Sequence, residues 1–489
     1  MRLRAIFVSA VLVLSGCTAS EITDPISDLK TLEDVYNQSV TWTECEEGFE
    51  CTTLGAPLDW LNPTDQFIPL ALTRKVGSSD KPVIFTNPGG PGVSGITWMQ
   101  SGYETLGSKE LRAEFQLIAF DPRGVGKSAG VVCQDQKIKD QVYYEQSPHS
   151  FGSPEDIQYS SELLADFASD CQSAGFDVAY FNTQQAARDL ELMRALVGGE
   201  QLDYLGFSYG TLLGATYAAL FPDRVGNLVL DGAINPLTSE ADATLGQVKG
   251  FDAAFRAYLA HCVEQLQCPF NGDAASALSV VKDFLLERER ETLPTQLDRE
   301  LSLQATLTGI VATLYSEQSW IYLSQAFEEA LDGDGTTFLL LADFYNEREL
   351  KGYVSNQNEA NRAISCADGR VADAEAAELN PRLIAASEVF GKYFAEPQLA
   401  CIGWPEGKSK VELNYSVQLA NPPLVVGTTG DPATPYSQAV ELKELLDGAT
   451  LLTLEADRHT AYGSNICIDA IVEAYFRGQD IGSGDKTCK

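Results

Sequence analysis

The strongest sequence constraint on how this chain can fold is a serine flanked by glycines, in Gly-Phe-Ser-Tyr-Gly at residues 206–210. An apolar run with the character of a buried strand precedes it, and a helical pattern follows until Pro222. A serine on so tight a strand-to-helix turn is held in a strained conformation that exposes its hydroxyl. Glycines on both sides leave room for the crossing chain, and the helix N-terminus favours negative charge beside it. We therefore predict that Ser208 is a nucleophile, rather than an incidental serine in a Gly-rich turn.

Apolar runs that end in Gly- or Asp-containing turns predict the strands of a buried sheet. They are residues 82–85, 115–120, 202–205, 227–230, 424–427 and 450–454. Helical patterns at 183–196 and 209–221 alternate with them, which indicates an α/β fold with a mostly parallel sheet flanked by helices. Helical periodicity dominates from 235 to 405, as at 251–265 and 320–332. We interpret that stretch as an inserted helical cap domain.

These patterns predict an order of segments along the chain. Residues 1–16 are expected to be a signal peptide and 17–40 a polar tether. The sheet domain would then comprise residues 41–234 and 406–489, with the cap at 235–405 between its two parts.

The general base follows by elimination, because a serine hydroxyl needs an adjacent base to be nucleophilic at neutral pH. The chain has three histidines, His149, His261 and His459. Where the nucleophile sits on such a strand-to-helix turn, the histidine comes last in chain order, which excludes His149. His261 lies within a predicted cap helix. His459 follows the last predicted strand, at the sheet edge where α/β proteins place their sites.

The acid that orients the imidazole should lie between the serine and the histidine in chain order. Asp431 follows the strand predicted at 424–427, in Gly-Asp-Pro-Ala-Thr-Pro. A turn-capping aspartate before proline is the structural alternative. Asp457 is the other candidate, but it is only two residues from His459. We favour Asp431.

Two backbone N–H groups should bind the oxyanion. One belongs to Tyr209, the residue after the nucleophile. The other should follow an early strand, where the sequence has Asn-Pro-Gly-Gly-Pro-Gly at residues 87–92. A phosphate-binding loop is the alternative, but the Gly-Lys-Ser/Thr ending of such loops is missing.

Five motifs together resemble the exported tripeptidyl aminopeptidases of actinobacteria, in the proline iminopeptidase branch of the α/β-hydrolases. The motifs are residues 87–92, 120–128, 206–210, 430–435 and 457–463. The resemblance implies a triad of Ser208, Asp431 and His459, and an oxyanion hole made by Gly90 with Tyr209. It also implies a disulfide between Cys366 and Cys401 in or near the cap. Residues 121–128 are expected to form a structural turn.

Members of this branch hold the substrate ammonium with cap carboxylates. The cap offers many, among them Glu317 and Asp368, and the sequence does not choose between them. For any single carboxylate, a solvated helix face is the simpler interpretation.

The amino terminus predicts export. Arg2 and Arg4 precede a mostly apolar stretch of ten residues, 5–14, which is too short to span a bilayer. The segment ends Leu-Ser-Gly-Cys at 14–17, which resembles a bacterial lipoprotein signal, so we expect Cys17 to be lipidated. An ordinary signal peptide with a chance cysteine is the alternative. The protein would be a cell-surface lipoprotein, touching the membrane only through a lipid anchor, or a secreted protein.

Ten further cysteines fit a disulfide set in an oxidising compartment. Sequential pairing is our hypothesis, because it closes short loops at both ends of the chain and within the insert. The pairs would be Cys45–Cys51, Cys133–Cys171, Cys262–Cys268, Cys366–Cys401 and Cys467–Cys488. A metal site is disfavoured, since there is no Cys-x-x-Cys and histidine is scarce. No cofactor is expected.

The charge balance argues against nucleic acid as a partner. The chain has 34 basic and 69 acidic residues, a net charge of −35, and such a field repels phosphates. It favours cationic substrates, although solubility of an exported protein is the simpler explanation.

We therefore expect an exported serine peptidase that releases residues or short peptides from substrates with a free amino terminus. A carboxylesterase with the same triad is the alternative, because the same fold hosts both chemistries. A ligand-binding lipoprotein without catalysis is a third hypothesis, which the ordered triad disfavours.

Overall fold

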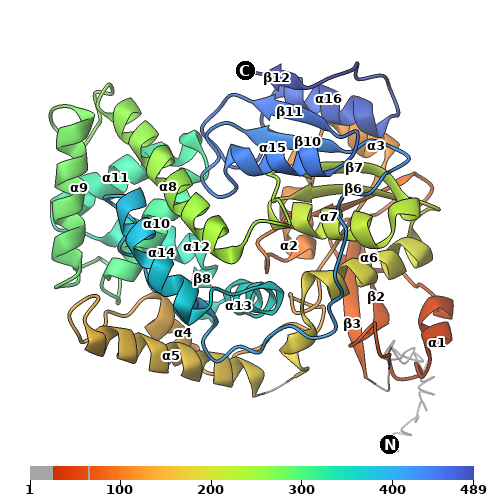
Figure 1. Ribbon diagram of the computed structural model, residues 1–489, viewed down its shortest axis with the longest axis horizontal. Helices are drawn as coiled ribbons and strands as arrows, with labels where there is room; N and C mark the ends of the chain where they lie inside the picture. The colour runs from red at the N-terminus through yellow and green to blue at the C-terminus, as the bar shows by residue number, and fades with distance from the viewer. Residues whose placement is uncertain (1–25, 64–65, 174) are drawn as a thin grey trace, which may run out of the picture.

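The computed structural model describes residues 26–63, 66–173 and 175–489. The chain forms a sheet domain and a helical cap, which lie side by side in Figure 1. The predicted signal peptide, the lipidation site Cys17 and the start of the tether lie outside the described residues. In the part of the chain that is described, no helix is both long and apolar enough to cross a membrane.

Ten strands of the described chain form one sheet in the order β1-β2-β3-β5-β4-β6-β7-β10-β11-β12. From β5 to β12 every pairing is parallel. The strands with this arrangement are β4 (Val83–Asn87), β5 (Gln116–Phe120), β6 (Leu202–Phe207), β7 (Val225–Asp231), β10 (Leu424–Thr428), β11 (Thr450–Leu454) and β12 (Lys486–Cys488). The predicted α/β fold with a mostly parallel sheet is confirmed, and the six predicted strands correspond to β4, β5, β6, β7, β10 and β11.

Three antiparallel strands extend one edge of the sheet, and the sequence patterns did not reveal them. They are β1 (Thr43–Glu46), β2 (Phe49–Pro57) and β3 (Phe67–Lys75). β1 is polar and exposed along its whole length, so it carries no apolar signal.

Helices cover both faces of the sheet, as a buried parallel sheet requires. Buried side chains of α2 (Gly95–Gly102), α3 (Lys109–Glu114) and α16 (Ile466–Phe476) pack on one face. Those of α6 (Thr183–Val197), α7 (Tyr209–Leu220) and α15 (Tyr436–Leu445) pack on the other. α1 (Leu32–Asn37) lies beside α6 and β2.

The cap is helical, with one short hairpin. Its elements are α8 (Glu240–Cys262), α9 (Ala274–Arg288), α10 (Leu303–Leu314), α11 (Trp320–Leu331), α12 (Thr336–Tyr345), β8 (Arg348–Glu349), β9 (Gly352–Tyr353), α13 (Gln357–Asp368) and α14 (Asp373–Ala386). Buried aromatic rings hold the bundle together, with Phe327 contacting Phe255, Phe284 and Phe338. Beyond α14 an extended stretch leads back to β10 (Figure 1).

A second segment joins the cap, although it precedes β6 in the chain. α4 (Gln136–Tyr143) and α5 (Pro154–Gln172) lie beneath the cap helices in Figure 1. Lys139 of α4 forms a buried ion pair with Glu359 of α13, with 2.8 Å between Nζ and Oε1. The hydroxyl of Tyr144 donates to the carbonyl of Ala342. The sequence patterns predict this segment as part of the sheet domain, at residues 41–234, whereas these contacts tie it to the cap.

Five disulfides stabilise these parts, and they join the cysteines in the sequential order set out above. They are Cys45–Cys51, Cys133–Cys171, Cys262–Cys268, Cys366–Cys401 and Cys467–Cys488. Cys366–Cys401 connects α13 to the short helix η5 (Pro397–Cys401) within the cap region.

Candidate active site

Ser208 lies on the tight turn between β6 and α7. Its φ of +53° and ψ of −122° place a non-glycine residue in a strained conformation. The turn needs its glycines, because a Cβ on Gly206 would lie 2.4 Å from the carbonyl oxygen of Gly210. One on Gly210 would lie 2.8 Å from the carbonyl oxygen of Asn87. The Ser208 hydroxyl forms no hydrogen bond within residues 26–63, 66–173 and 175–489, neither to His459 nor to any other described group.

His459 pairs with Asp431, which lies in the loop after β10. His459 Nδ1 is 2.8 Å from Asp431 Oδ1 and 2.9 Å from Oδ2. The backbone N–H groups of Ala433 and Thr434 and the Thr434 hydroxyl also donate to this carboxylate. A carboxylate so anchored holds the proton on Nδ1 and leaves Nε2 free to accept one.

The negative charge of Asp431 makes His459 a better proton acceptor. Burial alone would lower the pKa of His459, but the negative charge of Asp431 and its hydrogen bond raise that pKa above the usual value. Asp457, the other candidate acid, makes no side-chain hydrogen bond to His459 among the described residues; its Oδ1 lies close to Gly430. The structure thus brings Asp431 to the imidazole.

Backbone pairing brings the histidine next to the serine. Asp231, the last residue of β7, pairs with Phe207, which precedes Ser208. A Cβ on the next residue, Gly232, would lie 3.2 Å from His459 Cε1. The imidazole therefore lies over the carboxyl ends of β6 and β7, where the nucleophile turn begins.

Sequence reasoning missed Asp231, which anchors the histidine loop. Its fully buried carboxylate accepts the N–H groups of Ala461 and Tyr462 at 3.0 and 2.7 Å. Its own carbonyl accepts the N–H of Ser208 at 2.8 Å. Burial raises the pKa of Asp231 to about 6. An aspartate directly after an apolar strand was the available signal, but such residues also cap ordinary turns.

The loop at residues 87–92 crosses the start of α7. A Cβ on Gly89 would lie 3.1 Å from the backbone nitrogen of Tyr209, so the two backbones meet closely. The N–H of Gly89 donates to Asn87 Oδ1, whereas that of Gly90 has no acceptor in the described parts of the chain. Tyr209 is the first residue of α7, and such N–H groups lack intrahelical acceptors. Among the described residues, the backbone N–H groups of Gly90 and Tyr209 thus remain free for an oxyanion, as the predicted oxyanion hole requires.

The cap contacts both halves of the site. Asn361 of α13 donates from Nδ2 to the carbonyl of Pro91, in the loop that carries Gly90. The carbonyl of Tyr315, just after α10, accepts the backbone N–H of His459 at 2.9 Å. The site is therefore enclosed from the oxyanion side and from the histidine side.

The turn at residues 121–128 has the structural role expected of it. Arg123 is 1% exposed and binds Asp189 of α6 through two hydrogen bonds of 2.7 and 2.6 Å. Asp121 accepts the Ser94 hydroxyl and the N–H of Lys127, which ties this turn to the start of α2. The turn therefore holds the segment that follows the glycine-rich loop.

The two named cap carboxylates differ in their surroundings. Asp368 accepts both the N–H and the hydroxyl of Thr183, at 2.7 and 2.6 Å, and the same hydroxyl meets that of Tyr209. Burial raises the pKa of Asp368 to about 6. Glu317 is exposed, and its carboxylate has no hydrogen bond or ion pair within the described residues. Its backbone N–H donates to the carbonyl of Asp457, so it borders the histidine loop.

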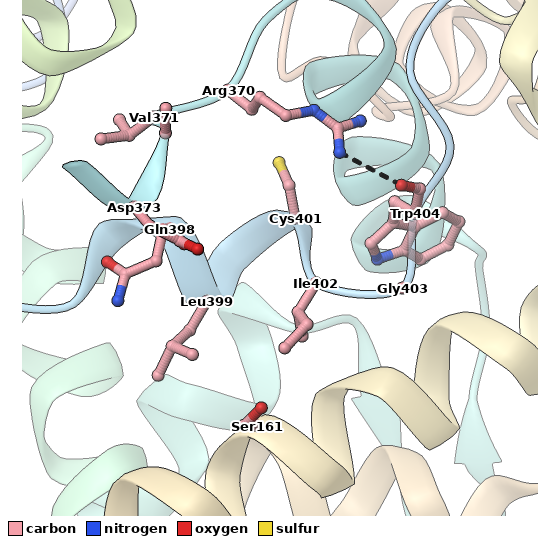
Figure 2. A pocket seen from close by; sticks show the side chains of 11 residues that line it. Ser161, Arg370, Val371, Asp373, Gln398, Leu399, Cys401, Ile402, Gly403 and Trp404 are labelled. Atoms are coloured by element: carbon pink, nitrogen blue, oxygen red, sulfur yellow. Dashed lines mark hydrogen bonds between the residues drawn. The ribbon is translucent and has the colours of Figure 1, made fainter. Parts of the chain in front are cut away.

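Two hollows lie at the edges of the cap, away from Ser208. One of about 640 Å³ separates α8 from the loop that carries Asp431. The other, of about 710 Å³, lies between α5 and η5. Figure 2 shows that Cys401 borders it and that Arg370 reaches the carbonyl of Trp404. No cluster of His, Cys, Asp and Glu in the described ranges has metal-binding geometry.

Comparison with known proteins points to the same fold and chemistry. Residues 82–465 match the family described as "alpha/beta hydrolase fold". Over 501 aligned residues the chain is 34% identical to "Serine protease Hip1" of Mycobacterium tuberculosis, covering 97% of this chain and 95% of that protein. It is 32% identical to "Carboxylesterase B" of the same organism, covering 89% and 87%. It is 28% identical to "Tripeptidyl aminopeptidase" of Streptomyces coelicolor, covering 92% and 86%.

Proposed function

Because this chain belongs to the α/β-hydrolase family and is a serine hydrolase of its actinobacterial branch, we propose that it is an exported peptidase acting on free amino termini. It would release single residues or short peptides through Ser208, His459 and Asp431. The observation that carries this proposal is the hydrogen-bonded pair of His459 and Asp431, next to a serine on a strained turn.

The first half of the reaction is acyl transfer to the serine. His459 Nε2 accepts the Ser208 proton as Oγ attacks the peptide carbonyl carbon. The resulting oxyanion accepts hydrogen bonds from the N–H groups of Gly90 and Tyr209. When the C–N bond breaks, the leaving amine takes the proton from His459.

The second half is hydrolysis of the acyl-enzyme. Water gives a proton to His459 as it attacks the ester carbonyl, and the same two N–H groups stabilise the second oxyanion. Ser208 leaves with the proton returned by the imidazole. No cofactor or metal is needed for either half.

The cap supports action on chain ends. It touches the loop that carries Gly90 through Asn361 and the histidine loop through Tyr315. A folded polypeptide could not pass through a site enclosed on both sides, whereas a short or unstructured end could. Glu317 is the exposed carboxylate that we propose for binding the substrate ammonium.

Export is supported by the five disulfides, since such bonds persist in oxidising compartments. We propose that Cys17 carries a lipid anchor after removal of residues 1–16. Mass spectrometry of the mature amino terminus tests this, and an unmodified cysteine there would defeat it.

Turnover of matched substrates tests the peptidase proposal. We expect a tripeptide anilide with a free amine to be cleaved about 10–100-fold faster, in kcat/KM, than its N-acetylated form, because a hydrogen bond to a charged group contributes about 1.5–3 kcal/mol. The Ser208→Ala variant provides the background rate. Equal rates on both anilides would contradict an aminopeptidase.

A carboxylesterase is the second candidate, because the relative named "Carboxylesterase B" covers most of this chain. Under that alternative, simple esters would be hydrolysed while both anilides stay intact.

A further inference from the structure

One tyrosine of the cap lies against the imidazole. Tyr315 meets the His459 ring edge-on, with ring centroids 5.4 Å apart and planes at 82°. Its carbonyl also accepts the backbone N–H of His459. A single cap residue thus contacts the histidine through both its backbone and its side chain.

The contact is part of a short antiparallel pairing between the cap and the histidine loop. Ser316 forms an antiparallel bridge with Arg458. On the far side of that bridge, the N–H of Glu317 donates to the carbonyl of Asp457 at 3.2 Å. Residues 315–317 and residues 457–459 are therefore joined by backbone hydrogen bonds in the manner of two antiparallel strands. Moving this part of the cap would break these hydrogen bonds.

Tyr345 contacts Tyr315 within the cap. Its ring lies 6.1 Å from that of Tyr315, and the two hydroxyls are 3.4 Å apart. The carbonyl of Tyr345 accepts Gln357 Nε2 at 3.1 Å. The carbonyl oxygen of Gln357 lies so close to Gly92 that a Cβ there would be 2.3 Å away. These contacts link the oxyanion loop to the imidazole through the cap.

We propose that Tyr315 is a positioning residue that sets the orientation of the His459 imidazole, with Tyr345 holding Tyr315 in place. Asp431 holds the ring only at Nδ1, which leaves it free to tilt about that contact. The Tyr315 ring restricts the tilt, and the backbone bond restricts the loop. The inference rests on the proposed function, because it requires His459 to act as the base.

The test compares ring-deleting and ring-keeping variants. Tyr315→Leu should lower kcat/KM about 10–100-fold, since a misplacement near 1 Å costs about that much. Tyr315→Phe keeps the ring and should stay within about threefold of the wild type. Tyr345→Ala should lower the rate about 3–10-fold and Tyr345→Phe should restore it, because the ring rather than the hydroxyl supports Tyr315.

Two readouts separate positioning from substrate binding and from general stability. The rate at which a small fluorophosphonate labels Ser208 should fall in parallel with kcat/KM, since this probe needs no peptide contact with the cap. The low-field proton resonance of the His459–Asp431 hydrogen bond should broaden or vanish in Tyr315→Leu. Tyr36→Leu, on α1 of the sheet domain, is the matched control and should change neither readout.

The outcomes separate this inference from the proposed function. If Ser208→Ala abolishes labelling while Tyr315→Leu is labelled at the wild-type rate with its resonance intact, the positioning role is overturned and the function stands. If Tyr315→Leu fails to fold, Tyr345→Ala takes its place in the test. An unchanged labelling rate in Tyr345→Ala would then overturn the positioning role of Tyr315. A fully active Ser208→Ala would overturn both.

Discussion

At the scale of single residues, both carboxylate oxygens of Asp431 reach His459 Nδ1, and four further donors hold the same carboxylate. The carboxylate is therefore fixed before substrate binds, and the imidazole presents only Nε2 to the serine. This preorganisation assigns Asp431 the role of orienting the tautomer and stabilising the imidazolium.

Replacing Asp431 by asparagine tests that role. Asp431→Asn should keep the fold but lower kcat about 10⁴-fold, because an amide donor facing Nδ1 favours the wrong tautomer. Steady-state kinetics checks the rate, and a melting curve near that of the wild type is the control. A loss below tenfold would contradict the assignment.

The pH profile tests the same pair. The base must be neutral to accept the serine proton, so activity falls as pH drops through the His459 pKa. Because Asp431 raises that pKa, the acid limb of kcat/KM should have its midpoint above pH 6.5. In Asp431→Asn the residual activity should have a midpoint at lower pH. A wild-type midpoint well below pH 6.5 would contradict the charge effect.

Residues with a local signature could be predicted from the sequence. Ser208, His459 and Asp431 each follow a strand, and their order along the chain is diagnostic. Asp231 and Tyr315 could not be predicted. Their partners lie 230 and 144 positions away, and nothing in the neighbouring sequence reveals them.

At the scale of elements, the site depends on how closely the glycine-rich loop approaches the cap. Gly92 has a φ of +105°. A Cβ there would lie 2.3 Å from the carbonyl oxygen of Gln357 and 2.9 Å from the backbone nitrogen of Asn361, both in α13. The loop and α13 therefore fit together only while this position lacks a side chain.

Gly92→Ala should displace the oxyanion loop. We expect kcat to fall at least about tenfold and stability by about 1–3 kcal/mol, from the clash and the strained φ together. Activity assays and chemical denaturation measure the two effects. Gly77→Ala is the matched control, because its φ of +79° is also positive but no atom lies within 4 Å. It should cost stability only. Equal effects of Gly92→Ala and Gly77→Ala on kcat would contradict a role for the close approach of Gly92 to α13.

The sequence predicted the strands of the parallel part of the sheet and missed its antiparallel edge, although β2 and β3 are largely buried. β4 to β7, β10 and β11 are apolar runs, so their pattern was sufficient. β1 is exposed throughout, and α4 and α5 have ordinary helical patterns that do not say which domain they join. That choice depends on pairs such as Lys139 with Glu359, which form only in the folded chain.

At the scale of the whole molecule, a net charge of −35 surrounds the site with a negative field. Such a field raises the local concentration of cations and accelerates their association. A peptide with a free amine and a basic side chain would be attracted, whereas a neutral ester would not.

Salt dependence tests this effect. Raising the ionic strength from about 0.01 M to about 0.5 M should lower kcat/KM for a cationic tripeptide anilide several-fold, because it shortens the Debye length from about 30 Å to below 10 Å. A neutral ester substrate, measured in parallel, should show little change. Equal salt effects on both substrates would contradict electrostatic attraction.

The identity of the nucleophile is the claim on which the proposed function depends. Treatment with a fluorophosphonate, followed by peptide mapping, should place one adduct on Ser208, and turnover of the free-amine tripeptide anilide should fall in proportion to its stoichiometry. An adduct on another residue, or full turnover with Ser208 completely modified, would contradict the account.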